Sequence, residues 1–479
     1  VDRATWHRLA EGTVRLLPSM PVRQLTLTMN AFARTAVVQT GWVHEAAKAL
    51  QQVDRGSMSA QDLSLAMSAL ARFMYCEGGQ LSRLLRNHAM PLLDDFAPQG
   101  LVSVAHATAR LSESQPNFRE GEHDIDAFLF SIASRIALSL EKLRPLELAL
   151  VLDAFTRRPA MFGDSTSLSQ VLLSRLLVKL APALLRLGPH EVIMVLTALA
   201  RRDIRCDALL TSSLVAVFQK ALPKLLGAEL AIGVHAGAQL SLDLQGLLYS
   251  DLTDGGILAA VKNCGPAHLA LCLHGLAKLH LQPPASFWRS LSRQVALPGA
   301  LDGPNSVRTI LAAAKTDWGD EMIMRLAWAV MDNLTGLGDE AVASLAYAQL
   351  HPYYFDSWRI AILLQHVGKH RQLQTSSFGI QVRTALVGLR FLANNVWQRL
   401  PLATVRILVN LVDSSDARPG WIPDHRVKLS ELQADVKVVL SAMCHEDPYY
   451  NLVRSEHVVW PFSIDMSMEG ASKDDVVWQ

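Results

Sequence analysis

The sequence predicts an all-α fold, a solenoid of stacked helix pairs with a short strand-containing C-terminal tail. A fourteen-residue pattern recurs along the chain, and its clearest copy is GPHEVIMVLTALAR at 188–201. Copies begin at residues 21, 59, 97, 144, 188, 226, 265 and 303, in steps of 38, 38, 47, 44, 38, 39 and 38 residues. A period of about 38 residues is typical of stacked helical repeats.

Each copy has the features of one amphipathic helix. Proline opens six of the copies, where its missing N–H has no partner to lose. Acidic residues follow near the positive end of the helix in four copies. Apolar residues then occupy positions five, eight, nine and twelve, as in Val192, Val195, Leu196 and Leu199, which predicts one buried face.

Position eleven of the pattern is small in every copy, which predicts close packing against a neighbouring helix. The residues are Ala31, Ala69, Ala107, Ala154, Ala198, Ala236, Gly275 and Ala313. A second apolar-periodic segment lies between copies, for example at 207–226 and 125–143, so each repeat is a helix pair. The longer steps hold polar inserts at 113–123 and 158–167, which we expect to be loops.

The pattern weakens toward the C-terminus, where 336–349 and 400–413 are degenerate copies. We therefore expect a regular solenoid over 1–317, a capping region over 318–427 and a separate tail over 428–479. In the tail, the sequence predicts a helix over 428–443 and a short strand over 458–466.

Composition favours a scaffold over several other classes of protein. The net charge of +1 argues against a strongly basic tail, and 50% hydrophobic residues can fill a continuous core. The five cysteines form no CxxC pair, so neither a disulfide framework nor a zinc site is predicted, and a reducing compartment is the simpler reading. No apolar run is long enough for a transmembrane helix. The chain begins at Val1 without Met, which fits either a removed targeting peptide or a simple boundary.

Position fourteen holds a cation in six copies, and stacking predicts a row of these side chains along one edge. Guanidinium groups in a row suit RNA phosphates, although the helix dipole alone also favours a cation in a last turn. Both explanations can hold at once, and Gln239 interrupts the series. The candidate phosphate-binding residues are Arg34, Arg72, Arg110, Arg157, Arg201 and Lys278.

Position ten lies one turn earlier on the same helix face and is polar and varied. This pattern fits side chains that contact base edges, one repeat to a base. The alternatives are hydrogen bonds between helices and simple solvent exposure. The possible base-contacting residues are Asn30, Ser68, His106, Asp153, Thr197, His235 and His274.

The sequence contains no motif that indicates catalysis or metal binding. The three histidines of position ten lie in different repeats, without HExxH or Cys/His ligand spacing. No phosphate-binding loop, GxSxG or GxGxxG motif occurs. Asp465 in the tail is better explained by a structural strand than by a nuclease site, which needs further acids around a metal. We expect no catalytic residue, metal, cofactor or small-molecule substrate.

The repeat, with its PxxxLxxxLxALAR pattern, resembles the octotricopeptide and heptatricopeptide repeat proteins of organelles, which are related to FAST-kinase-like proteins. The tail is similar to the entry of a RAP domain, in Leu432-Gln433, Val436, Glu446-Asp447 and Phe462–Asp465. The rest of a RAP domain is absent, which leaves RAP-borne nuclease activity without support. The resemblance implies an α-solenoid that binds organellar RNA, and some members belong to mitochondrial ribosomes.

We therefore expect a non-enzymatic RNA-binding scaffold in a mitochondrion, with a plastid as the alternative. The leading hypothesis is a protein of the mitochondrial ribosome that contacts rRNA and neighbouring proteins. One alternative is a factor that stabilises or processes one organellar mRNA. The other is a scaffold subunit that binds only proteins.

Overall fold

The computed structural model forms two compact units, Val1–Asn263 and Cys264–Gln479. The boundary between them falls inside the regular region predicted over 1–317, and the predicted boundaries near 317 and 427 stay predictions. The structure describes residues 3–35, 40–54, 56–75, 79–113, 122–158, 167–202, 204, 206–253, 256–261, 264–295, 301–316, 318, 325–326, 329–330, 334–351, 355–370, 381–382, 384–386, 388–389, 393–408, 450–459 and 462–470.

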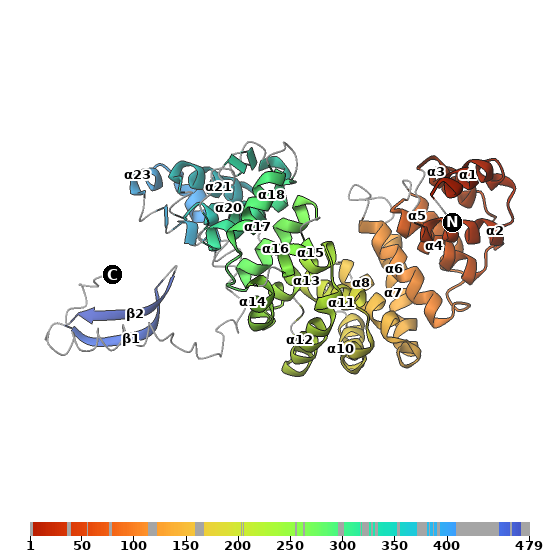
Figure 1. The fold of residues 1–479 in the computed structure, drawn as a ribbon, viewed down its shortest axis with the longest axis horizontal. Coiled ribbons are helices and arrows are strands. Elements are labelled where there is room, and N and C mark those ends of the chain that lie inside the picture. The colour runs from red at the N-terminus through yellow and green to blue at the C-terminus, as the bar shows by residue number, and fades with distance from the viewer. Residues whose placement is uncertain are drawn as a thin grey trace. The chain divides into compact units, whose positions relative to one another are not determined.

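The first unit is a stack of repeated helices, each of which packs against the next one in chain order (Figure 1). These helices coincide with the repeated sequence pattern. They are α2 (Val22–Arg34), α4 (Ala60–Phe73), α6 (Pro98–Glu113), α8 (Pro145–Arg157), α11 (Pro189–Arg201) and α13 (Ala228–Gln239).

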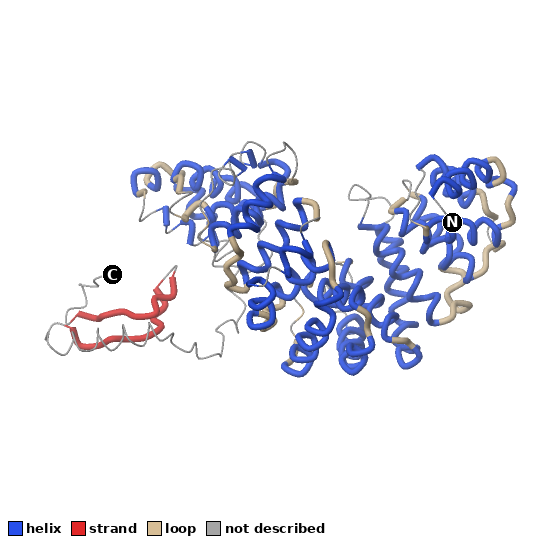
Figure 2. The backbone as a smooth tube through the Cα atoms, viewed as in Figure 1, coloured by secondary structure: helices blue, strands red, loops and turns tan. Residues whose placement is uncertain are grey.

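A second set of helices alternates with the first, so the expected helix pairs are present, and Figure 2 shows helices joined by short loops. α3 packs on α1 and α2, α7 on α6, α10 on α8 and α12 on α11. The set comprises α1 (Arg3–Val14), α3 (Thr40–Gln51), α5 (Gln80–Leu84) with a π-helical turn (Leu85–Ala89), α7 (Glu122–Ser139), α10 (Ser167–Ala183), α12 (Ala208–Ala221), α14 (Gln245–Thr253) and α15 (Gly256–Val261).

The starts of the repeated helices follow from their sequences. Pro98, Pro145 and Pro189 are the first residues of α6, α8 and α11, as predicted. At α4 the Ser59 hydroxyl accepts a hydrogen bond from the backbone N–H of Asp62 at 3.2 Å. At α8 the Glu147 carboxylate accepts one from the backbone N–H of Arg144 at 2.8 Å. Both bonds satisfy donors that a helix terminus would otherwise leave unpaired.

The predicted apolar face forms the core of the first unit. Val192, Val195, Leu196 and Leu199 of α11 are at most 2% exposed. The small residues of position eleven are also buried in α4, α6, α8, α11 and α13. Ala31 is the exception and lies exposed on α2.

Ion pairs join neighbouring repeats at several places in the first unit. Arg23 of α2 donates to Asp62 of α4 at 2.8 Å, and the Thr26 hydroxyl contacts the same carboxylate. On the second helices, Arg135 of α7 donates to Asp94 at 2.6 Å. Asp62 is buried, whereas Asp94 is exposed, and exposed pairs such as Arg135–Asp94 stabilise a fold only slightly.

The second unit continues the same architecture. α16 (Pro266–Lys278), α18 (Gly303–Lys315) and α20 (Asp339–Ala348) pack in succession, with α17 (Ala285–Val295) on α16 and α21 (Ser357–His370) on α20. α23 (Asn394–Trp397) follows, and residues 402–408 are helical. The degenerate copy predicted at 336–349 corresponds to α20. The copy predicted at 400–413 includes the helical residues 402–408, and its last five residues lie outside the described part of the chain.

The tail contains an antiparallel hairpin of two strands, β1 (Tyr450–Val459) and β2 (Phe462–Gly470). Val459 pairs with Phe462 at one end of the ladder and Tyr450 with Gly470 at the other. The single strand predicted over 458–466 therefore covers parts of both strands. The helix predicted over 428–443 and the predicted inserts, except their ends, lie outside the described residues. Within the described part of the chain, no helix combines the length and apolarity that a membrane span requires.

The tight stacking gives a testable prediction at Gly233 of α13, where most other copies carry a larger side chain. A Cβ atom there would lie 2.5 Å from Cδ1 of Ile193 and 2.9 Å from Cε2 of Phe218. We expect Gly233→Val to lower the free energy of unfolding by about 1–3 kcal/mol in a urea titration, because the packed core has no room for it. The matched control is Gly246→Ala in α14, where no atom lies within 4 Å of the added Cβ. Equal stability of the two variants would contradict this packing.

Candidate RNA interface

The side chains of position fourteen end the repeated helices, and their exposure differs along the stack. Arg34 of α2 and Arg72 of α4 are exposed, whereas Arg110, Arg157 and Arg201 are half-buried. Each cation lies in or next to the last turn of its helix, as the helix dipole favours.

Neighbouring cations of the row interact with each other from α4 to α11. Arg110 is electrostatically coupled to Arg72 on one side and to Arg157 on the other. Arg157 and Arg201 meet at one carboxylate, that of Asp153. The first unit therefore places four of the predicted residues along one edge of the stack.

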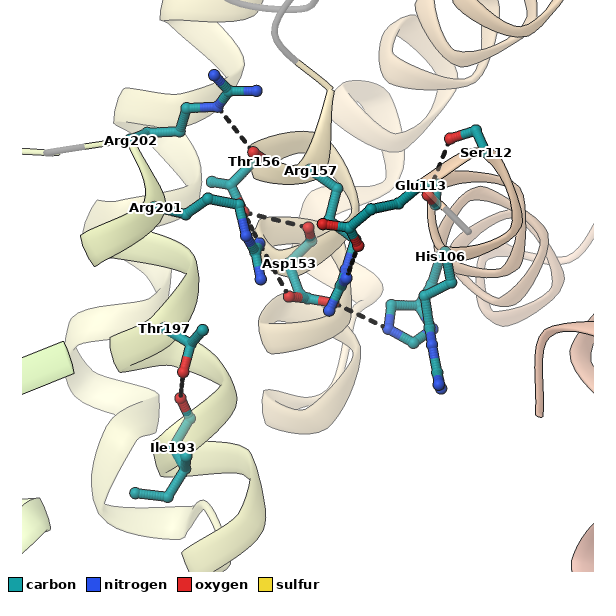
Figure 3. Close-up of polar contacts among 12 residues, drawn as sticks. His106, Ser112, Glu113, Asp153, Thr156, Arg157, Ile193, Thr197, Arg201 and Arg202 are labelled. Carbon is teal, nitrogen blue, oxygen red and sulfur yellow. Dashed lines mark hydrogen bonds and ion pairs between the residues drawn. The ribbon is translucent and has the colours of Figure 1, made fainter. Parts of the chain in front are cut away.

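Asp153 of α8 is the centre of a buried polar cluster, and Figure 3 shows three side chains turned toward it. His106 Nε2 lies 3.1 Å from Oδ2, and Arg157 Nε donates to the same oxygen at 2.8 Å. Arg201 Nη1 donates to Oδ1 at 3.2 Å. The carboxylate is 2% exposed, so these groups from α6, α8 and α11 compensate its charge in place of water.

Further hydrogen bonds extend the cluster around the end of α8. Arg157 also pairs with Glu113 at the end of α6. Arg201 Nη1 donates to the Thr156 hydroxyl at 3.0 Å, and Arg202 Nε donates to the Thr156 carbonyl oxygen at 2.7 Å (Figure 3). The cluster thus ties three consecutive repeated helices together.

The cluster has a strong effect on its own ionisation. Burial by itself raises the pKa of the Asp153 carboxyl, but hydrogen bonds from His106 and Arg157 and their charges outweigh it and hold the pKa well below its ordinary value. Burial also lowers the pKa of Arg157, yet Asp153 and Glu113 outweigh it and raise the pKa above its ordinary value. Both groups are therefore charged throughout the neutral range.

Arg110 of α6 has a different environment from Arg157. Its Nη2 lies 3.4 Å from Sδ of Met74, a weak acceptor. Burial lowers the pKa of the Arg110 guanidinium, and Arg157 and Arg72 lower it further, although Asp153 and Glu113 act in the opposite direction. Arg110 is therefore a partly desolvated cation that has a sulfur atom, and no carboxylate oxygen, as its hydrogen-bond acceptor.

The candidates of position ten have several different environments. Asn30 and Ser68 are half-buried, and the Thr197 hydroxyl donates to the backbone oxygen of Ile193 at 2.7 Å. His106 and Asp153 bond to each other, which matches the alternative of a hydrogen bond between helices. His235 and His274 are buried in their helices, at 8% and 9% exposure.

The second unit carries its own short pair of cations. Lys278 ends α16 and Lys315 ends α18. Partial desolvation lowers the pKa of the Lys315 ammonium, and repulsion from Lys278 lowers it further, which shows that the two side chains are neighbours. Lys315 lies at position thirteen of its copy, one residue before Thr316, so it is a neighbour of the predicted Lys278 without belonging to the position-fourteen series.

Some residues of the cluster were missed by the sequence reasoning, namely Glu113, Thr156 and Arg202. A signal for the cluster was present at Asp153, because an acid four residues before Arg157 on a helix predicts an ion pair. No group of three or more His, Cys, Asp or Glu side chains that suits a metal ion occurs among the described residues. The side chains that we place along this edge are therefore mainly arginines, which are cations and hydrogen-bond donors.

The fold defines a helical-repeat protein, and the row of guanidinium groups gives it an edge suited to phosphates. A family model described as RNA-editing substrate-binding complex 6 protein matches residues 4–155. The match runs from α1 into α8 and includes Arg34, Arg72 and Arg110 but not Arg157 or Arg201. No curated protein sequence matches the chain at a significant level.

The Asp153 cluster gives a prediction about stability and pH. Asp153→Asn removes the charge that Arg157 and Arg201 face, so we expect the free energy of unfolding at neutral pH to fall by about 3 kcal/mol. Because the folded-state pKa of Asp153 is lower than that of the unfolded chain, its stabilisation is complete above about pH 4 and is lost as the pH falls further.

Urea unfolding of both proteins at pH 7 and near pH 3 measures this effect. The stability difference between wild type and variant should shrink at the lower pH. The exposed Asp54→Asn is the control and should leave stability nearly unchanged at both values. A stability difference that is independent of pH would contradict the assigned role of the carboxylate charge.

Proposed function

We propose that the chain is a non-enzymatic helical-repeat scaffold that binds RNA in an organelle. In this proposal, cations from the position-fourteen row hold phosphate groups, and neighbouring proteins of a ribonucleoprotein cover other surfaces of the stack. Phosphate contacts give affinity and register without reading the sequence. The proposal includes no cofactor, metal or small-molecule substrate.

One observation carries the proposal: cations of α4, α6, α8 and α11 lie in succession along one edge. An evenly repeated set of cations matches a polymer whose charges also repeat. The similarity of residues 4–155 to a family described as RNA-editing substrate-binding complex 6 protein supports RNA as that polymer. It also favours work on RNA substrates within an editing or processing complex.

The organelle and the kind of ribonucleoprotein are also part of the proposal. The resemblance of the repeats to organellar proteins supports a mitochondrion, with a plastid as the alternative. The ribosomal setting expected from the sequence competes with an mRNA-processing setting, which agrees better with the description of the matched family. The third possibility is a scaffold that binds only proteins.

A salt titration tests the RNA-binding proposal. We expect the purified chain to bind a labelled single-stranded RNA with an affinity that falls as salt rises, with a log–log slope of about −0.7 for each phosphate contact. The RNA recovered from the same mixture, with Mg²⁺ added, should remain full length. Binding that is absent at low salt would reject the proposal in favour of the protein scaffold, and RNA cleavage would reject its non-enzymatic part.

Sedimentation of the native protein distinguishes the settings. We expect the protein to sediment within a large particle and to move to lighter fractions after ribonuclease, because RNA holds it there. Crosslinks to ribosomal RNA would favour the ribosome, and crosslinks to mRNA would favour processing or editing. Sedimentation that ribonuclease leaves unchanged would contradict an RNA-held particle.

A further inference from the structure

The arginines of the row belong to two groups with different partners. Arg157 and Arg201 both donate to the buried Asp153 carboxylate, and Arg157 also pairs with Glu113. Only 20% and 23% of these two side chains are exposed. Two cations therefore face two carboxylates, and an RNA phosphate would have to compete with existing ion pairs.

Arg34, Arg72 and Arg110 form the second group, at the ends of α2, α4 and α6. None of them forms an ion pair with a carboxylate among the residues that the structure describes. Arg34 and Arg72 reach solvent, and Arg110 donates only to the sulfur of Met74. The guanidinium groups of these three arginines therefore have no carboxylate in direct contact among the described residues, which is what 'uncompensated' means below.

Met74 occupies the position beside Arg110 that a phosphate oxygen would take. It ends α4 with a left-handed backbone, φ 52° and ψ 36°, which a side chain other than glycine adopts at a cost. Its side chain is 51% exposed, although it contacts Arg110. A phosphate oxygen in place of the thioether would turn a weak hydrogen bond into a charge-assisted one.

The same end of the stack also holds the unengaged candidates of position ten. The side chains of Asn30 and Ser68 make no hydrogen bond within the described part of the chain, whereas His106, Asp153 and Thr197 do. Asn30 precedes Arg34 by one turn, and Ser68 precedes Arg72 in the same way. An amide and a hydroxyl thus lie beside two uncompensated arginines.

We propose that one single-stranded RNA segment binds along α2, α4 and α6. Its phosphates contact Arg34, Arg72 and Arg110, and its bases lie over Asn30 and Ser68. Arg157 and Arg201 act as internal counterions of Asp153 and take no phosphate. This proposal rests on the RNA-binding function proposed above and localises it to one end of the first unit.

Geometry favours a single strand over a duplex. Consecutive repeated helices pack against each other, and packed helices lie about 8–10 Å apart, so the cations repeat at roughly that distance. A flexible single strand can adjust its phosphates to such a row and turn its unpaired base edges toward the side chains. In an RNA duplex those base edges are occupied by pairing.

The experiment compares two triple variants with the same change in net charge. Arg34→Ala/Arg72→Ala/Arg110→Ala removes the proposed site. Arg83→Ala/Arg175→Ala/Arg186→Ala removes three exposed arginines of the second helices and their adjoining turns. Fluorescence anisotropy of labelled oligouridine over a salt series measures both, and thermal unfolding establishes that each variant is folded.

We expect the first triple variant to bind at least about tenfold more weakly at low salt, and its salt slope to be smaller by about 2, or 0.7 for each lost contact. The control should stay within about twofold of wild type in affinity. A second pair, Asn30→Ala/Ser68→Ala, should keep the salt slope and change the ranking of oligouridine against oligoadenine, because it removes base contacts but no charge.

Three results would overturn the localisation while leaving RNA binding in place. They are equal losses in both triple variants, unchanged binding in the first together with loss in Arg201→Ala, and stronger competition by duplex than by single-stranded RNA. Failure of the wild-type chain to bind oligouridine would instead remove the proposed function itself. The two proposals therefore fail in distinguishable ways.

Discussion

The joint between α6, α8 and α11 depends on one negative charge that is almost completely removed from water. Asp153 can remain ionised there only because His106, Arg157 and Arg201 surround it. Each of these partners belongs to a repeated helix, so the charge balance can be satisfied only when the three repeats are stacked in the correct register. The apolar faces bring the helices together, and the carboxylate adds a directional requirement that apolar contacts lack.

The same interaction explains why an evenly repeated sequence gives an edge that is not uniform. Six of the eight copies have a cation at position fourteen, but an acid at position ten occurs only in the copy of α8. That acid, Asp153, forms ion pairs with Arg157 and Arg201. Arg34, Arg72 and Arg110, which come earlier in the row, remain without such a partner among the described residues. Local chemistry in one repeat thus divides a periodic row into a structural part and an available part.

Much of the first unit was predictable from sequence because each repeat is built from short-range information. Proline at the helix start, apolar spacing and a small residue at position eleven each act within one or two turns, and the structure has them at Pro145, Leu196 and Ala198. Ala31 was wrongly expected to be packed, because the pattern does not indicate which helix covers this face of each copy. The site was harder to predict, since the partners of Asp153 lie 47 and 48 residues away on other helices. Only the spacing to Arg157 was visible in the sequence. The roles of the row in RNA binding stay predictions.

The way the Asp153 cluster joins three helices also bears on the dynamics of the stack. In a stack of repeats, each unit contacts mainly its neighbours, so end repeats can open while the middle stays folded. Ala31 of α2 is exposed, whereas Asp153 joins α8 to both adjacent repeated helices, by a hydrogen bond with His106 of α6 and an ion pair with Arg201 of α11. The amide hydrogens of α8 should therefore exchange with solvent only through openings that also separate α6 and α11.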